Sequence, residues 1–369
     1  MKTIGIVTFW DSNDNYGQLL QNFALTFFLK KMNYEPFLIK SKVIKQRSIT
    51  KKIKKLLSYF FSPLRLKHAI EYKIMKKNAA EANKSHPRGF DIFRKKYIPF
   101  TKEYTLQELY EEPPKFDVFI TGSDQVWATL SPVFFLQFAP SSSKKIAYAA
   151  SMGGFQPYGK DLETFKSYIS NFDMVSLREQ QSVDYLASQR VTNIICLPDP
   201  TLLLSAADYR HICNLKEKKS KPYVFLYLLG NKLDFNIKQI YEYAMQKKLD
   251  VIYVASQGRT DKFPKTYPTT EEWLELIENA EIIVTNSFHG TVFSMIFKKK
   301  FISILLSGQY TNTNNRITNI LYKYGLERHI YNGSLDSIDE YPNYHIFDKK
   351  LQEEIDFVKQ KMYNTIEGP

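Results

Sequence analysis

Residues 281–297 have the sequence EIIVTNSFHGTVFSMIF, and this stretch decides the fold class. An apolar run of strand length, Glu281–Thr285, is followed directly by a short polar turn and then by an apolar helix pattern. An apolar run of this kind is typical of a strand that is buried on both faces of a parallel sheet. A strand, a tight turn and a helix in this order predict one βα unit of an open α/β sheet.

The same alternation of strand and helix patterns continues along the chain. We expect strands near residues 4–9, 36–39, 117–121, 145–150, 174–177 and 193–197, and again near 223–228, 250–255, 281–285 and 301–305. We expect helices at 18–31, 235–246, 271–279, 290–297, 315–324 and 349–362, and a helical insertion over about 45–96. This alternation predicts an α/β protein with two doubly wound parallel-sheet, Rossmann-like domains that face each other across a cleft.

The length of the chain supports two domains. Its 369 residues fit two α/β domains of roughly 150–200 residues each. We predict a first domain at 1–213, with a basic helical insertion at about 42–98, and a second domain at 222–345. The polar, lysine-rich stretch between them is the best linker candidate. We expect the final helix, within 346–369, to return to the first domain.

Composition excludes several classes of protein. A hydrophobic content of 44% is ample for folded cores, which excludes a disordered chain. The two cysteines, Cys196 and Cys213, lie in neither a CxxC pair nor a metal-ligand spacing, so we expect no disulfide framework and no metal site. Residues 1–10 lack the pattern of a secretory signal, and no stretch approaches the roughly 20 apolar residues of a membrane span. We therefore expect a cytoplasmic protein.

The formal net charge of +13 suggests an anionic partner. Much of the excess lies in the basic segment 42–98, where residues 51–61, KKIKKLLSYFF, set apolar side chains among lysines. Such a segment can bind the surface of an anionic membrane, and the alternative is a solvated helix packed on its own domain. Nucleic acid is not an expected partner, because the basic and aromatic residues form no recognised binding motif.

The turn at 286–290, NSFHG, is the first candidate site. Ligands of open parallel sheets bind beyond the carboxyl ends of strands, where this turn lies. Asn286 or Ser287 can cap the helix, whose free N–H groups favour a phosphate or carboxylate, and Gly290 allows close approach of the backbone. His289 would then donate a hydrogen bond or a proton in an anion-binding site. The alternative is that His289 only caps the turn.

Two arginines follow strands in the same way. Arg178 comes at the carboxyl end of the strand near 174–177 and could grip a planar anion through two parallel N–H bonds. The alternative is an ordinary ion pair with Glu179 or another neighbour. Arg316 follows the strand near 301–305 through a polar loop, and its alternative is a surface arginine at the start of a helix.

A third cluster follows the strand near 117–121, where residues 122–127 read GSDQVW. These groups suit sugar hydroxyls. Asp124 could accept a proton from an attacking hydroxyl and Trp127 could stack on a sugar face, or they could simply cap the next segment and fill the core. The stretch 13–18, NDNYGQ, has a similar place after the first strand and lacks the GxGxxG pattern, which disfavours a nicotinamide cofactor.

Five of these motifs together resemble the polysaccharide pyruvyl transferase family. They occur in the order of that family and span the chain from Gly5 to about Leu326: NYGQLLQNFAL at 15–25, GSDQVW at 122–127, SLRE at 176–179, DPTLL at 199–203 and SFHG at 287–290. Each motif alone is weak, whereas five in order are a strong signal.

The resemblance implies a fold similar to GT-B glycosyltransferases and a reaction that transfers pyruvyl from phosphoenolpyruvate to a glycan, forming a pyruvate ketal. It places the acceptor on the first domain and the donor on the second. Arg178 and His289 match positions that contact the donor. Some branches of the family carry a basic residue where Ser287 stands here, and Arg316 is our substitute on grounds of charge.

We therefore expect His289 and Asp124 to be the catalytic acid and base. The donor would be bound by Arg178, Arg316, Asn286, Ser287 and Gly290, and the acceptor by Asn15, Gln21, Gln125 and Trp127. No cofactor and no metal is required, because phosphoenolpyruvate is itself the donor. The basic segment favours a lipid-linked acceptor at the inner face of the plasma membrane. The alternatives are a GT-B-type glycosyltransferase that uses a nucleotide sugar, and a non-catalytic glycan-binding protein.

Overall fold

The structure is a computed structural model of the whole chain. It describes residues 1–41, 70–71, 73–74, 77–78, 80–82, 84–216, 221–230, 233–256, 259, 261–306 and 314–368. The first part of the basic segment, residues 42–69, lies outside the described residues, and so does part of the expected linker, residues 217–220.

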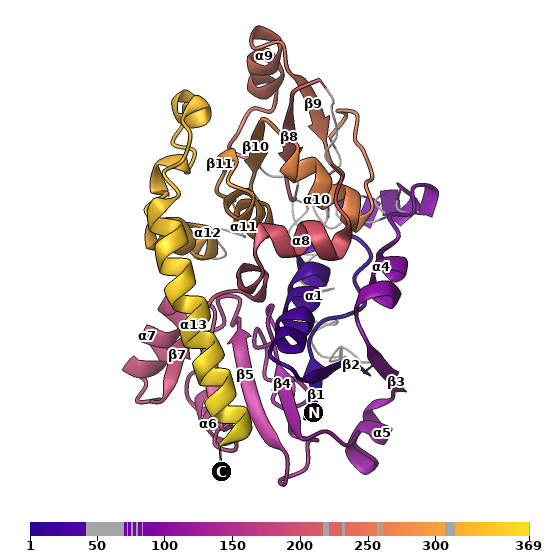
Figure 1. The fold of residues 1–369 in the computed structure, drawn as a ribbon, viewed down its shortest axis with the longest axis vertical. Coiled ribbons are helices and arrows are strands. Elements are labelled where there is room, and N and C mark those ends of the chain that lie inside the picture. Colours follow the sequence, from indigo (N-terminus) through magenta and orange to yellow (C-terminus); the bar gives the residue numbers. More distant parts are fainter. Residues whose placement is uncertain are drawn as a thin grey trace.

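Two parallel sheets form the frame of the molecule (Figure 1). The larger has seven strands in the order β3-β2-β1-β4-β5-β6-β7, and the smaller has four in the order β11-β10-β8-β9. The strands of the larger sheet are β1 Thr3–Val7, β2 Glu35–Ser41, β3 Phe100–Tyr104, β4 Val118–Thr121, β5 Lys144–Ala150, β6 Met174–Leu177 and β7 Ile194–Cys196. Those of the smaller sheet are β8 Tyr223–Tyr227, β9 Asp250–Tyr253, β10 Ile282–Thr285 and β11 Lys300–Ser303. The prediction of a doubly wound α/β fold with two parallel sheets is confirmed.

Helices connect the parallel strands and carry the residues that follow them. They are α1 Tyr16–Lys31, α4 Phe90–Tyr97, α5 Leu106–Glu111, α6 Lys160–Ile169, α7 Gln180–Ser188, α8 Ala206–Cys213, α9 Lys238–Gln246, α10 Thr270–Glu278, α11 Phe288–Ile296, α12 Asn315–Lys323 and α13 His345–Glu367. Short 3-10 helices lie at η1 Pro200–Leu203, η3 Glu327–His329 and η4 Asp336–Asp339. No helix in the described ranges combines the length and the apolar character needed to cross a bilayer.

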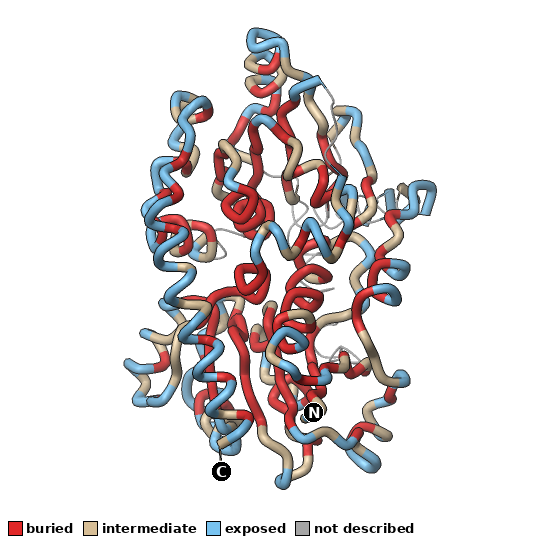
Figure 2. Tube along the Cα trace, viewed as in Figure 1, coloured by how far each residue is buried: buried red, intermediate tan, exposed pale blue. Residues whose placement is uncertain are grey.

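The half of the chain that carries the larger sheet and the half that carries the smaller sheet share one hydrophobic core. Tyr16 of α1 stacks on Trp273 of α10, with ring centroids 5.1 Å apart, and its hydroxyl donates to the carbonyl of Pro268 at 2.6 Å. Tyr209 of α8 packs edge-on against Phe293 of α11. Figure 2 shows buried chain running through both sheets and across the junction between them. The halves are therefore held together by packed aromatic side chains, in addition to the covalent connection.

The C-terminal helix α13 runs from the smaller sheet along the side of the larger one (Figure 1). Its apolar residues Val358, Met362 and Ile366 are fully buried. Near its end, Glu367 forms a salt bridge of 3.1 Å with Lys2, next to β1. The last helix of the chain thus packs on the half that the first strand belongs to.

Candidate active site

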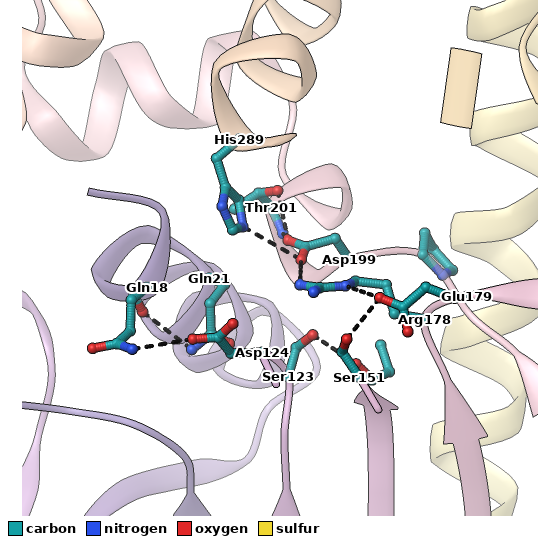
Figure 3. A network of polar contacts seen from close by, with 12 residues as sticks. Gln18, Gln21, Ser123, Asp124, Ser151, Arg178, Glu179, Asp199, Thr201 and His289 are labelled. Atoms are coloured by element: carbon teal, nitrogen blue, oxygen red, sulfur yellow. Dashed lines mark hydrogen bonds and ion pairs between the residues drawn. The ribbon is translucent and has the colours of Figure 1, made fainter. Parts of the chain in front are cut away.

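Three charged or ionisable side chains from both halves of the chain meet at one point. Arg178 follows β6, Asp199 follows β7 and His289 lies in the first turn of α11. The Nη1 atom of Arg178 donates to Oδ2 of Asp199 at 2.8 Å, and Nε2 of His289 lies 3.5 Å from the same oxygen. Figure 3 shows the guanidinium and the imidazole approaching this carboxylate from different elements. The carboxyl ends of strands from both sheets therefore converge on one polar cluster.

Asp199 is the centre of this cluster. Its side chain is fully buried, and its Oδ1 accepts hydrogen bonds from the backbone N–H and the hydroxyl of Thr201, at 3.0 and 2.7 Å. Burial alone would raise the pKa of Asp199, but the charges of His289 and Arg178 and the bond from Thr201 hold this pKa well below its usual value. Asp199 is therefore a carboxylate anion that lies between the guanidinium of Arg178 and the imidazole of His289.

Two nitrogen atoms of the cluster have no partner of their own. The Nη2 atom of Arg178 and Nε2 of His289 are buried without a hydrogen bond, since the 3.5 Å contact to Asp199 is too long to be a good one. Buried donors are normally satisfied, and those that are not often mark the place of a ligand. Both nitrogens can donate to an anion.

Helix α1 sets the position of the imidazole. A Cβ atom placed on Gly17 would lie 2.0 Å from Nδ1 of His289 and 2.4 Å from its Cγ. Only glycine at this position of α1 leaves room for the ring. The ring of His289 is thus held between the first helix of one half and the buried carboxylate of Asp199.

A second guanidinium lies close to the first. Arg178 and Arg316 both lie over the ring of Phe288, at 4.9 and 5.8 Å from its centroid. Burial, and then the charge of Arg178, lowers the pKa of Arg316 from its usual value. For Arg178, the carboxylates of Glu179 and Asp199 outweigh the effect of burial and raise the pKa. Two positively charged guanidiniums beside the ring of Phe288 favour the binding of an anion between them.

A pocket of about 70 Å³ lies beside these arginines, between the two halves. Glu179 and Arg316 both line it, together with Ser182 and Tyr185 of α7. Oε1 of Glu179 accepts from Nε of Arg178 at 3.1 Å and from the hydroxyl of Ser151 at 2.7 Å. The pocket therefore has one carboxylate and one guanidinium in its lining.

The turn between β10 and α11 is built largely by contacts within the protein. Ser287 caps α11 by accepting from the N–H of Gly290 at 3.3 Å. The side-chain amide of Asn286 bridges the backbone N–H and carbonyl of Leu229, at 2.6 and 3.0 Å. A Cβ atom on Gly290 would meet Oγ1 of Thr285 at 2.4 Å, so this glycine serves close packing on β10. The predicted donor contacts of Asn286 and Gly290 therefore correspond to structural roles within the turn.

Asp124 lies in a separate polar group at the end of β4. Its Oδ2 accepts from the side chain of Gln18 at 3.1 Å, and in Figure 3 this pair lies to one side of the arginine cluster. Asn15 caps α1 through the N–H of Gln18. Gln125 is half-buried and packs against Gly153, where the pocket begins. Asp124, Asn15 and Gln125 remain next to the site without contacting its arginines.

Two of the residues expected to bind the acceptor lie in the interior. Trp127 is fully buried, stacks on Phe135 at 4.7 Å between ring centroids, and donates its indole N–H to the carbonyl of Phe134 at 2.9 Å. The prediction that Trp127 stacks on a sugar is wrong. Gln21 is also fully buried and donates to the hydroxyl of Thr8 at 3.2 Å, so it too is not accessible to a glycan.

Comparison with known sequences decides the family. The sequence model of polysaccharide pyruvyl transferases matches residues 15–308, which is most of the chain. The chain belongs to the polysaccharide pyruvyl transferase family. No curated protein shows significant sequence similarity to this pyruvyl transferase family member.

Solved structures with a similar arrangement include enzymes that act on nucleotide sugars. Staphylococcus aureus MnaA with bound UDP is 11% identical, with a TM-score of 0.47, and the match covers 99% of this chain and 96% of that one. A UDP-GlcNAc 2-epimerase of Methanocaldococcus jannaschii is 12% identical (TM-score 0.45, 96% and 99% covered). Anabaena HepE with UDP and glucose is 9% identical (TM-score 0.43, both chains fully covered).

The motifs of this pyruvyl transferase family member contain functional candidates to which the sequence analysis gave no role. Asp199 stands at the start of DPTLL, Glu179 at the end of SLRE and Gly17 within NYG. Each contacts Arg178 or His289 in the structure. Their presence in the motifs was the available signal, but only the fold shows that these three segments meet. Within the described ranges, no group of three His, Cys, Asp or Glu side chains is arranged to hold a metal.

Proposed function

We propose that this protein transfers a pyruvyl group from phosphoenolpyruvate to a sugar of a surface-polysaccharide precursor, forming a pyruvate ketal and releasing phosphate. The observation that carries the proposal is the convergence of Arg178, Arg316 and His289 from both halves of the chain. Phosphoenolpyruvate has a phosphate and a carboxylate, so its site needs several cationic donors at short range. Two guanidiniums at one ring, with unpartnered N–H donors on Arg178 and His289, meet that need.

The residues suggest a division of roles. Arg178 and Arg316 would bind the two anionic groups of the donor, with the capped N-terminus of α11 at Ser287 nearby. His289 would deliver a proton to the methylene carbon of the enol, which creates an oxocarbenium-like carbon that a sugar hydroxyl attacks. Asp124 would accept the proton of an attacking hydroxyl. These roles require no metal and no further cofactor.

The acceptor is proposed to be lipid-linked and to be reached at the inner face of the plasma membrane. This part of the proposal rests on the sequence of the basic segment 42–98, whose lysines suit anionic lipid headgroups. It is independent of the chemistry at Arg178 and His289.

A phosphate-release assay tests the proposed reaction. The enzyme is incubated with phosphoenolpyruvate and p-nitrophenyl glycosides of galactose, glucose and N-acetylmannosamine, and the glycan is analysed by mass spectrometry. We expect phosphate release together with a product heavier by pyruvate minus water. Release of nucleoside diphosphate from a nucleotide sugar would instead support a glycosyltransferase. Glycan binding without turnover of either donor would indicate a non-catalytic glycan-binding protein.

A further inference from the structure

The pocket between the halves continues directly from the arginine cluster. Arg316 lines one side of it and also lies over the ring of Phe288, next to Arg178. Glu179 and residues of α7 line it as well. A molecule in this pocket would therefore lie next to an anion bound by the two arginines.

Glu179, which lines this pocket, has one carboxylate oxygen without a hydrogen-bond partner. The residue is only 8% exposed, and its Oε1 already accepts two hydrogen bonds, from Arg178 and from Ser151. Its Oε2 is buried and has no hydrogen-bond partner. A buried carboxylate oxygen without a partner is costly, and a ligand that donates a hydroxyl would satisfy it. A sugar is such a ligand.

The rest of the lining suits a sugar as well. Gln156 and Ser182 can exchange hydrogen bonds with hydroxyl groups, while the rings of Phe155 and Tyr185 offer apolar surface to the C–H face of a pyranose. This surface differs from the one expected from the sequence, where Trp127 was to stack on the sugar.

We propose that this pocket binds the acceptor sugar and that Oε2 of Glu179 accepts a proton from one of its two reacting hydroxyls. The inference rests on the proposed function, because it assigns the acceptor and a second base to the same reaction. Asp124 remains the candidate for the other hydroxyl.

Two C–O bonds form between sugar oxygens and the C2 carbon of phosphoenolpyruvate. The π bond of the enol breaks and its electron pair forms the new C–H bond at the methylene carbon, while the bond from C2 to the phosphate oxygen breaks with its electron pair on the phosphate. Each sugar hydroxyl loses one proton, the first to Glu179 and the second to Asp124. One proton is added to the methylene carbon from His289, and the released phosphate takes up the other. No oxidant or reductant takes part.

Replacing Glu179 with glutamine tests the base. E179Q keeps the size of the side chain and an oxygen that can accept from Arg178 and Ser151. We expect kcat for phosphate release with the best p-nitrophenyl glycoside to fall by about 10²–10⁴-fold. The Kd for phosphoenolpyruvate, measured by isothermal titration calorimetry without acceptor, should stay within about threefold of wild type, because the glutamine oxygen can still accept the hydrogen bond from Arg178.

Filling the pocket tests the location of the acceptor. Ser182→Phe should raise the KM for the glycoside by about tenfold or more while the Kd for phosphoenolpyruvate stays unchanged. Ser188→Phe is the matched control, since Ser188 is an exposed residue at the other end of α7 and does not line the pocket. It should leave both constants at wild-type values.

Each outcome separates the inference from the proposed function. If wild-type enzyme releases phosphate and E179Q does so at a similar rate, Glu179 is not a base and only the inference is overturned. If the affinity of E179Q for phosphoenolpyruvate falls by the same factor as its kcat, the role of Glu179 is only to hold Arg178 in the donor site. The inference is then wrong as well. An unchanged KM for the glycoside in Ser182→Phe would show that the acceptor does not bind in this pocket. A wild-type enzyme that never consumes phosphoenolpyruvate would overturn both.

Discussion

Replacing Gly17 with alanine places a methyl group where the imidazole of His289 lies. The new Cβ atom would be 2.0 Å from Nδ1, whereas ordinary contacts between such atoms are about 3.5–4.0 Å. The ring must therefore retreat by about 1.5 Å, away from α1. A displacement of about 1 Å in a catalytic group can reduce the rate by about 100-fold. We expect at least that loss of kcat for phosphate release in Gly17→Ala.

The effect on stability follows from two opposing terms. Forcing an extra methyl group into a packed site costs about 1–3 kcal/mol. Alanine in place of glycine in a helix contributes at most about 0.5–1 kcal/mol in return. The net free energy of unfolding should thus fall by about 0–2 kcal/mol in Gly17→Ala, measured by urea denaturation.

A double-mutant cycle with His289→Ala provides the control. Without the ring, the methyl group has no clash, so Gly17→Ala should become neutral or stabilising in that background. The coupling between the two positions should then be about 1–3 kcal/mol. If Gly17→Ala has the same effect on stability with and without the imidazole, or if the single variant keeps wild-type turnover, the ring does not lie against α1 as described and our account of its positioning fails.

The remaining predictions concern the charged cluster, the core and the membrane. His289→Ala should abolish most phosphate release with the fold intact by circular dichroism; near-normal turnover would remove the histidine from the chemistry. Asp199→Asn should lower the free energy of unfolding by up to about 3–5 kcal/mol at neutral pH, because the buried guanidinium of Arg178 loses one of its two carboxylate partners. The folded-state pKa of Asp199 is depressed, so its contribution is fully present above the unfolded value near ~3.9 and is lost as pH falls through the folded value. The difference between variant and wild type in urea titrations should therefore be constant from pH 7 to about 5 and shrink in stronger acid. Trp127→Ala should lower the free energy of unfolding by about 3–5 kcal/mol, because the side chain lies in the core. A variant that keeps its stability and changes only the KM for the sugar would contradict this position. Changing the four lysines of residues 51–55 to glutamine should weaken co-sedimentation with vesicles of anionic lipid and leave turnover of soluble glycosides unchanged; equal sedimentation would argue against the basic segment as a membrane contact.

The strands of this fold were predictable because most of them are buried on both faces. Runs such as Ile282–Thr285 and Val118–Thr121 are apolar throughout and are followed by turn residues, which sets their ends to within a few residues. The strand β3, Phe100–Tyr104, was missed. It lies at the edge of the larger sheet, where Lys102 and Glu103 face solvent, so its sequence FTKEY carries no apolar run. Edge strands often lack the signal that buried strands give.

The site was predictable where a single rule applies. Arg178 and His289 each follow a strand of a parallel sheet, and ligands of such sheets bind beyond the carboxyl ends of the strands. The sequence did not indicate that Asp199 would join them, because that contact depends on how the segment after β7 packs between the halves. For Trp127, stacking on a ligand and filling a core have the same sequence pattern. Only burial distinguishes them.

The geometry of His289 depends on packing more than on its own hydrogen bonds. Its ring has one polar contact, of 3.5 Å, to Asp199, and on the other side it lies against the backbone of α1 at Gly17. Helix α1 is in turn joined to the other half by Tyr16, which stacks on Trp273. Because the histidine comes from one half and both Asp199 and Gly17 come from the other, its position relative to Arg178 depends on how the two halves pack, including this aromatic contact. Residues that are far from the chemistry and only pack the two halves together should therefore affect turnover before they affect the fold of either sheet.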